Sequence, residues 1–140
     1  MFEPEKPLIL DRKTGVILFA EGSTREEANQ SVWKVAAVVG ACSDFDFVRP
    51  AFLETAKPDL AETVAEAVGL SIERLLVVPY YVIFNPRVQE QLPQLIAAAS
   101  RRHSQLDIRL TAPLEGHPLL AEIILERTRQ LLRSISPPPA

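Results

Sequence analysis

Four apolar runs, each followed by a segment with helical periodicity, constrain the fold of this 140-residue chain more than any other feature. The runs are nearly continuous in apolar residues, which is typical of strands that are covered on both faces of a parallel sheet. Four strand–helix units in succession predict an α/β fold, a three-layer sandwich in which a four-stranded parallel sheet carries helices on both faces. The predicted strands span residues 16–20, 47–53, 75–84 and 108–112.

Local signals place the starts of the predicted helices. Ser23 and Thr24 each fit a capping box for the first helix. Pro58 suits the first position of the second helix, and Pro118 opens the fourth. The start of the third helix is left open, because Pro93 should not lie deep inside a helix.

The chain has room for one domain, or for half of a symmetric assembly. We expect an N-terminal arm over residues 1–15, which includes a weakly indicated edge strand at 8–10. The α/β domain is expected at 16–135, and the proline-rich residues 136–140 are expected to form a disordered tail.

Composition excludes several classes of protein. The formal net charge of −3 leaves no basic surface for nucleic acid. The longest apolar stretch, residues 75–84, falls far short of the ~20 residues that a membrane helix needs. The N-terminus carries acids and prolines where a signal peptide has a basic start and an apolar run. Cys42 is the single cysteine, which excludes an internal disulfide and favours a cytoplasmic location.

Polar side chains follow the predicted strands at the points where they end. Glu21, Glu54, Arg87 and His117 come after the first, second, third and fourth strand. Because parallel strands end at one edge of a sheet, and because ligands bind outside that edge, these side chains form the candidate site.

Four segments around these residues carry motifs in a fixed order. They are Glu-Gly-Ser-Thr at 21–24 with Glu-Ala-Asn at 27–29, Phe-Leu-Glu at 52–54 with Pro-Asp-Leu at 58–60, the run 78–84 followed by 86–93, and Pro-Leu-Glu-Gly-His-Pro-Leu at 113–119. In this order they resemble one known family, the short sirohydrochlorin cobaltochelatases and ferrochelatases of the class II chelatase fold. The resemblance extends from about residue 16 to about residue 132 and implies a homodimer with its cleft between two halves.

The departures from the family pattern bear on the reaction. The resemblance implies metal-binding histidines where this chain has Glu21 and Arg87, an aspartate where it has Gln91, and an arginine where it has Thr24. A carboxylate can still bind a divalent metal or accept a proton, but a guanidinium can do neither. The two-histidine site is therefore expected to be absent, and Arg87 suits a substrate carboxylate instead.

These arguments assign a role to each candidate residue, with alternatives. Glu21 and Glu54 are the candidate catalytic residues, and Glu21 is also the candidate metal ligand. Glu21 could instead be a solvated loop acid, and Arg87 could pair with Glu90 or with Glu21 across the cleft. His117 could simply cap the following helix. The candidate substrate-binding residues are Arg87, Ser23, Tyr81 and His117.

Three functions follow from the resemblance and its departures. The first is a tetrapyrrole-binding protein whose metal insertion is impaired, with Arg87 and Arg25 holding acidic side chains of the ring. The second is an active chelatase that inserts Co²⁺ or Fe²⁺, its metal substrate, with Glu21, Glu54 and His117 in place of the histidines. The third is a structural or regulatory protein whose pocket is closed. No resident cofactor is expected.

Overall fold

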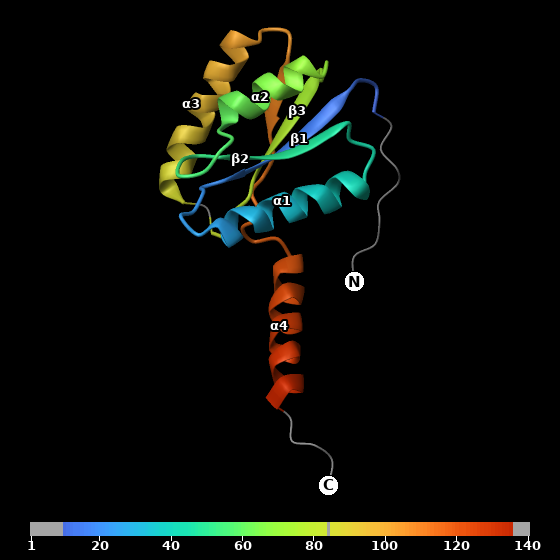
Figure 1. Ribbon diagram of the computed structural model, residues 1–140, viewed down its shortest axis with the longest axis vertical. Helices are drawn as coiled ribbons and strands as arrows, with labels where there is room; N and C mark the ends of the chain where they lie inside the picture. The colour runs from blue at the N-terminus through green and yellow to red at the C-terminus, as the bar shows by residue number, and fades with distance from the viewer. Residues whose placement is uncertain (1–9, 84, 136–140) are drawn as a thin grey trace.

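The computed structural model of the chain describes residues 10–83 and 85–135, in which four strands alternate with four helices (Figure 1). The strands are β1 (Thr14–Ala20), β2 (Phe47–Phe52), β3 (Arg74–Pro79) and β4 (Asp107–Leu110). The helices are α1 (Glu26–Ala41), α2 (Leu60–Gly69), α3 (Pro86–Arg102) and α4 (Leu119–Ile135). Residues 8 and 9 of the predicted edge strand and the predicted tail at 136–140 lie outside the described residues, and the domain limits stay a prediction.

The four strands form one parallel sheet in the order β2-β1-β3-β4, which confirms the α/β prediction. Strand β1 is central, and all seven of its residues are buried, as its continuous apolar run predicts. Phe19 of β1 pairs with Ala51 on one side and with Pro79 on the other, so the three strands end almost level.

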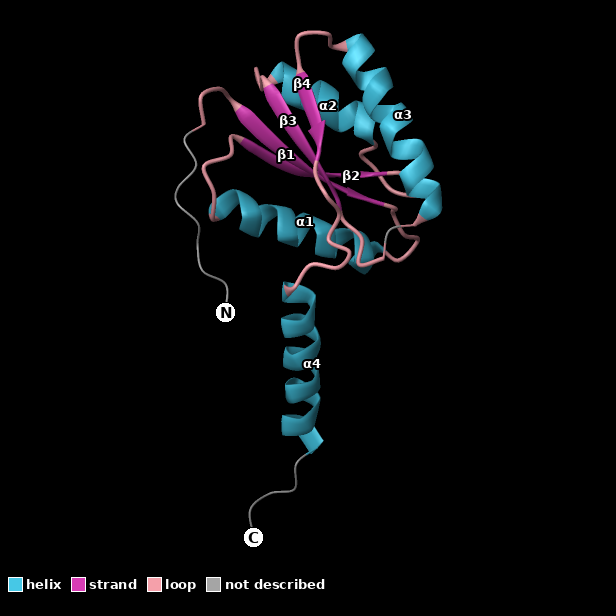
Figure 2. Ribbon diagram, turned by 180° about the vertical axis from the view of Figure 1, so that it is seen from behind, coloured by secondary structure: helices cyan, strands magenta, loops and turns pink. Residues whose placement is uncertain are grey.

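Helices cover both faces of this sheet and make three layers (Figure 2). On one face, Val32 and Ala36 of α1 join a buried cluster with Val16, Leu18 and Val48 of the sheet. On the other face, α2 and α3 pack against the alternate residues of the same strands. That second cluster includes Ile17, Phe19, Leu75, Val77, Leu60, Val64, Val88 and Leu92.

Helix α4 stands apart from these layers. It projects away from the sheet in both views (Figures 1 and 2), and none of its residues is buried. Among the elements that the structure describes, no helix or strand comes into contact with α4. Of the described helices, α1, α2 and α3 therefore cover the two faces of the sheet.

Two of the predicted helix starts are wrong. The capping box at Ser23 or Thr24 does not form, since α1 begins after Arg25 with no side-chain cap, and the Ser23 hydroxyl accepts a hydrogen bond from the Arg25 N–H instead (3.0 Å). Pro58 lies before α2, after a cis peptide bond, and not at its first position. Asp59 caps α2 in a capping box with Glu62, at 2.9 and 3.0 Å.

The third strand–helix unit also differs from its prediction. Strand β3 ends at Pro79, five residues earlier than expected, because the Tyr80 N–H makes the last bond to β1 (Phe19 carbonyl, 2.8 Å). Helix α3 begins at Pro86, so Pro93 does lie inside it. Pro93 is on the exposed side of the helix, where the missing N–H donor leaves no buried acceptor unsatisfied.

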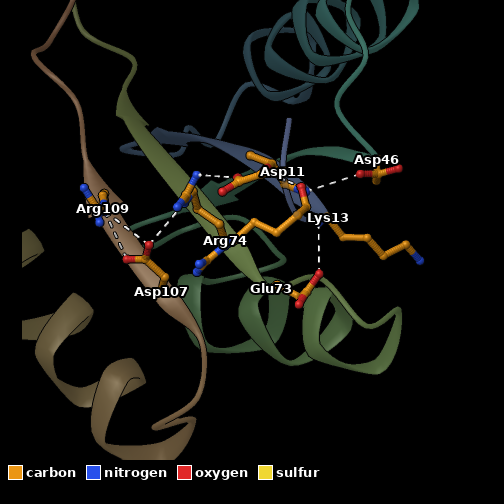
Figure 3. A network of polar contacts seen from close by, with 9 residues as sticks. Asp11, Lys13, Asp46, Glu73, Arg74, Asp107 and Arg109 are labelled. Atoms are coloured by element: carbon orange, nitrogen blue, oxygen red, sulfur yellow. Dashed lines mark hydrogen bonds and ion pairs between the residues drawn. The ribbon is translucent and has the colours of Figure 1, made fainter. Parts of the chain in front are cut away.

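The opposite edge of the sheet, where the strands begin, is joined by a network of polar contacts (Figure 3). Arg74 at the start of β3 donates to Asp107 at the start of β4 (3.1 Å), and Arg109 donates to the same carboxylate (3.1 Å). Glu73 accepts a hydrogen bond from the backbone N–H of Lys13, which precedes β1 (3.1 Å). These contacts fix the relative register of β1, β3 and β4 at the edge away from the candidate site.

Candidate functional site

The carboxyl ends of β1 and β2 bring Glu21 and Glu54 side by side. The parallel ladder continues past both strands, because the Leu53 N–H donates to the Ala20 carbonyl (2.9 Å) and the Glu54 N–H donates to the Glu21 carbonyl (3.1 Å). The two acids therefore sit at matching positions on neighbouring strand ends, as the rule for parallel sheets predicts.

Gly22 permits this close approach of the two loops. Its φ is +93°, and a Cβ atom at this position would lie 2.0 Å from the Glu54 carbonyl oxygen. Real side chains do not reach such a distance, so the backbone of the first loop can pass the second only at a glycine.

Asn29 of α1 fixes the next residue of the first loop. Its buried side chain accepts a hydrogen bond from the Ser23 N–H (2.9 Å) and donates one to the Ser23 carbonyl (2.8 Å). The Ser23 N–H is thus already used, and the Ser23 hydroxyl accepts from Arg25. The hydroxyl hydrogen of Ser23 stays available to donate to a ligand.

Helix α3 carries Arg87, the third residue of the site. Asn85 caps this helix, its side chain accepting a hydrogen bond from the Arg87 N–H (2.9 Å). From the first turn of α3, the Arg87 guanidinium reaches back to both acids. Its Nη2 donates to Glu54 Oε2 (2.5 Å), and its Nη1 lies 3.9 Å from Glu21 Oε1. We call Glu21, Glu54 and Arg87 the rim triad.

The rim triad is electrostatically coupled but open to solvent. The hydrogen bond from Arg87, with its charge, holds the pKa of Glu54 below its usual value, and Glu54 in turn raises the pKa of Arg87. The three side chains keep 42–47% of their surface exposed. Exposed ion pairs contribute little to stability, so another carboxylate can replace Glu54 on Arg87 at small cost.

Tyr81 follows β3 at the same edge of the sheet as the rim triad. It is half-buried and packs against the core cluster beneath α2 and α3. Burial, and then the negative charge of Glu21, raise the pKa of its hydroxyl well above the ordinary value. The phenol is therefore neutral at physiological pH and cannot act there as a base.

The structure does not bring His117 into the triad. His117 is exposed in the loop before α4, and its Nδ1 accepts a hydrogen bond from the Leu119 N–H (3.1 Å). This contact supports the capping role that the sequence left open. Within residues 10–83 and 85–135, no three His, Cys, Asp or Glu side chains form a group that could hold a metal ion.

Two contributions to the site were missed at the level of sequence. Arg87 was expected to pair with Glu90 or Glu21, whereas its shortest contact is with Glu54. Asn29 was noted only as part of a motif. In the structure its buried side-chain amide bonds both the N–H and the carbonyl of Ser23, and so holds the first loop of the site in place. No sequence signal identifies such a contact, since it joins a helix to a loop six residues away.

The structure shows no helix that is long and apolar enough to span a membrane among its described residues.

Comparison with known proteins gives relatives of one kind. The chain is 26% identical over 121 residues to the chloroplastic sirohydrochlorin ferrochelatase of Arabidopsis thaliana. This alignment covers 86% of the chain and 54% of the plant protein. It is 23% identical to the sirohydrochlorin cobaltochelatase of Methanopyrus kandleri, with 84% of this chain and 96% of that protein covered. The chain thus spans about half of the plant enzyme and nearly all of the archaeal one.

Solved structures agree with the fold. A crystal structure of a CbiX protein from Marinobacter aquaeolei VT8, described as a protein of cobalamin (vitamin B12) biosynthesis, superposes with a TM-score of 0.74 at 25% identity and covers 86% of this chain and 98% of that one. The sirohydrochlorin chelatase SirB of Bacillus subtilis, in complex with cobalt, gives a TM-score of 0.77 at 19% identity, with 84% of this chain and 50% of that chain covered. The sequence model of the CbiX family matches residues 15–131, and the chain therefore belongs to the CbiX family.

Proposed function

We propose that this protein binds a tetrapyrrole of the sirohydrochlorin type and holds its carboxylates through Arg87. The observation that carries the proposal is the place of this guanidinium. It is exposed at the carboxyl edge of the sheet in a CbiX-family domain, between two acids that a ligand can displace. The relatives named above act on sirohydrochlorin, according to their names.

The chemistry of the triad supports carboxylate recognition. A guanidinium offers five N–H donors in a planar fork that matches a carboxylate, and at present Glu54 takes one of these donors at 2.5 Å. A carboxylate of the ligand can take the place of Glu54, because the pair is exposed to water. Ser23, Tyr81 and His117 are the further candidate contacts, through a hydroxyl hydrogen, a ring face and the imidazole Nε2.

Whether the protein also inserts a metal into the bound ring depends on the two acids of the rim triad. Glu21 and Glu54 are the candidate groups to accept the pyrrole protons, and Glu21 the candidate to receive the metal substrate, Co²⁺ or Fe²⁺. Arg87 works against this, since its positive charge lies within 3.9 Å of both carboxylates and repels an incoming cation. We therefore propose a binding protein with impaired insertion.

One observation favours a second function, that of a structural or regulatory protein with a closed site. Arg87 already contacts both acids, as a closed cleft would require. We further propose, from the resemblance alone, that the protein is a homodimer. A cytoplasmic location is likewise a proposal, supported by the single exposed cysteine, which has no cysteine partner within the chain.

Titration of the purified protein with sirohydrochlorin, followed by absorption spectroscopy with and without Co²⁺ or Fe²⁺, separates these functions. We expect a saturable spectral shift in the absence of metal and no acceleration of metal insertion. Accelerated insertion would show an active chelatase. No spectral change with sirohydrochlorin would refute the proposal. The remaining function would then be that of a structural or regulatory protein with a closed site.

A further inference from the structure

The loop that joins β2 to α2 forms a hollow beside the rim triad. The hollow has a volume of about 380 Å³ and is lined by Leu53, Glu54, Thr55, Ala56, Lys57 and Asp59. Glu54 therefore lies between two cations, because it contacts Arg87 and also shares the hollow with Lys57. This placement gives the Glu54 carboxylate a second position to occupy when another carboxylate binds Arg87.

Lys57 has a donor left for a further carboxylate. Its Nζ lies 3.2 Å from Glu62 Oε1 and 3.5 Å from Asp59 Oδ2. An ammonium group has three N–H donors, and these contacts use at most two of them. The side chain is 75% exposed, so it can turn toward Glu54 without leaving a packed position. Lys57 can therefore donate to Glu54 while it keeps at least one of its present partners.

The backbone of Glu54 is fixed on both sides. Its N–H donates to the Glu21 carbonyl (3.1 Å), and Gly22 lies against its own carbonyl. The next residue, Thr55, has a φ of +72°, a conformation that β-branched residues rarely adopt. Such strain persists only where the surrounding contacts determine the backbone. An exchange of Glu54 between the two cations therefore needs side-chain rotation alone.

We propose that Glu54 is an internal competitor for Arg87, and that Lys57 is a positioning residue that receives Glu54 when a carboxylate of the ligand displaces it. The exchange replaces one exposed ion pair within the chain by another, so the ligand gains the guanidinium at small cost. Lys57 acts through Glu54 and does not touch the ligand. This inference rests on the proposed recognition of ligand carboxylates by Arg87.

Two effects on affinity follow, and they have opposite signs. While Glu54 occupies Arg87, only a fraction of the molecules can accept the ligand, and the apparent dissociation constant rises by the inverse of that fraction. An exposed ion pair makes this factor about fivefold, so Glu54→Gln should bind metal-free sirohydrochlorin about five times more tightly than the wild type. Lys57→Gln should bind it about three times more weakly, because the displaced carboxylate then faces Asp59 and Glu62 without a cation.

Absorption titrations with metal-free sirohydrochlorin at low ionic strength measure both effects, and circular dichroism checks the fold of every variant. Glu27→Gln is the control for Glu54→Gln, since it removes an exposed acid from the first turn of α1, outside the rim triad. Lys34→Gln is the control for Lys57→Gln, since Lys34 is an exposed lysine of α1, which packs on the other face of the sheet. Each control changes the net charge as its variant does and should change the dissociation constant little.

The double variant distinguishes positioning from a structural role of Lys57. Lys57 also contacts Asp59 and Glu62, the capping box of α2, so its loss could act through that helix. A structural effect of Lys57→Gln would weaken binding equally in the wild type and in Glu54→Gln. Under the exchange, Lys57→Gln should have no effect in the Glu54→Gln background, because no carboxylate is displaced there.

Each outcome bears on one part of the inference. Glu54→Gln with the affinity of its control would overturn the competition, and a Lys57→Gln effect of equal size in both backgrounds would overturn the positioning role. In either case, wild-type binding that is lost in Arg87→Gln would leave the proposed function standing. Binding by Glu54→Gln with none by the wild type would support the competitor and refute the proposed function. No binding by either would refute both.

Discussion

Replacing Gly22 by alanine tests how the rim triad is assembled. The added Cβ would lie 2.0 Å from the Glu54 carbonyl oxygen, where ordinary contacts begin at 3.4 Å. The two loops must therefore separate by more than 1 Å, which breaks the bond from the Glu54 N–H to the Glu21 carbonyl. In addition, φ at this residue is +93°, a conformation that alanine adopts only at a cost.

Two other glycines separate these two contributions. Gly116 also has a positive φ (+75°), but a Cβ there would meet nothing within 4 Å. Gly69, the last residue of α2, has neither a positive φ nor a neighbour within 4 Å. We expect Gly116→Ala to destabilise by about 1–2 kcal/mol from the backbone alone. Gly69→Ala should stabilise by about 0.5–1 kcal/mol through helix propensity.

For Gly22→Ala the lost hydrogen bond, about 1 kcal/mol, and the displaced loops add to the backbone cost, which gives about 3 kcal/mol in total. Urea unfolding at one fixed protein concentration measures the free energy of unfolding for the wild type and the three variants. A loss for Gly22→Ala no larger than that for Gly116→Ala would refute the close approach of the two loops.

Two further predictions concern ion pairs. Because Arg87 lowers the pKa of Glu54, the ion pair persists at neutral pH and is lost as the pH falls through that lowered value. In the variant Arg87→Gln, ¹³C NMR should show the pKa of Glu54 rising toward 4.5. An unchanged titration of Glu54 would contradict its contact with Arg87. Asp107→Asn removes the carboxylate that Arg74 and Arg109 share and should destabilise by about 1 kcal/mol at pH 7. The two arginines lower the pKa of Asp107 from its ordinary value of 3.8, so this difference in unfolding free energy should shrink as the pH falls past 3.8 and vanish below the lowered pKa of the folded protein.

The sheet could be predicted from the sequence because its signals are local and repeated. Continuous apolar runs such as that of β1 require cover on both faces, and the strand–helix alternation then leaves a parallel sheet as the simple solution. The predicted helix starts that were wrong involve residues that can take either of two structural roles. Pro58 can open a helix or precede one, and Ser23 can cap a helix or bond within its own loop.

The site could be predicted only in part, for a related reason. The topology places Glu21, Glu54 and Arg87 at one edge, and this much follows from the order of the strands. Which acid Arg87 contacts depends on the reach and direction of a long side chain from α3, and no periodicity encodes it. The position of α4 could not be predicted either, because its amphipathic pattern predicts packing against apolar residues, whereas α4 contacts no other helix or strand among the described elements.

Binding of sirohydrochlorin to the wild type and to Arg87→Gln, measured by absorption titration without metal, tests the central claim most directly. Arg101→Gln is the matched control, an exposed arginine at the opposite end of the same helix α3. Loss of a charge-assisted hydrogen bond predicts a dissociation constant roughly tenfold to hundredfold higher for Arg87→Gln, and an unchanged value for Arg101→Gln. Equal affinity of the wild type and Arg87→Gln would contradict carboxylate recognition by Arg87.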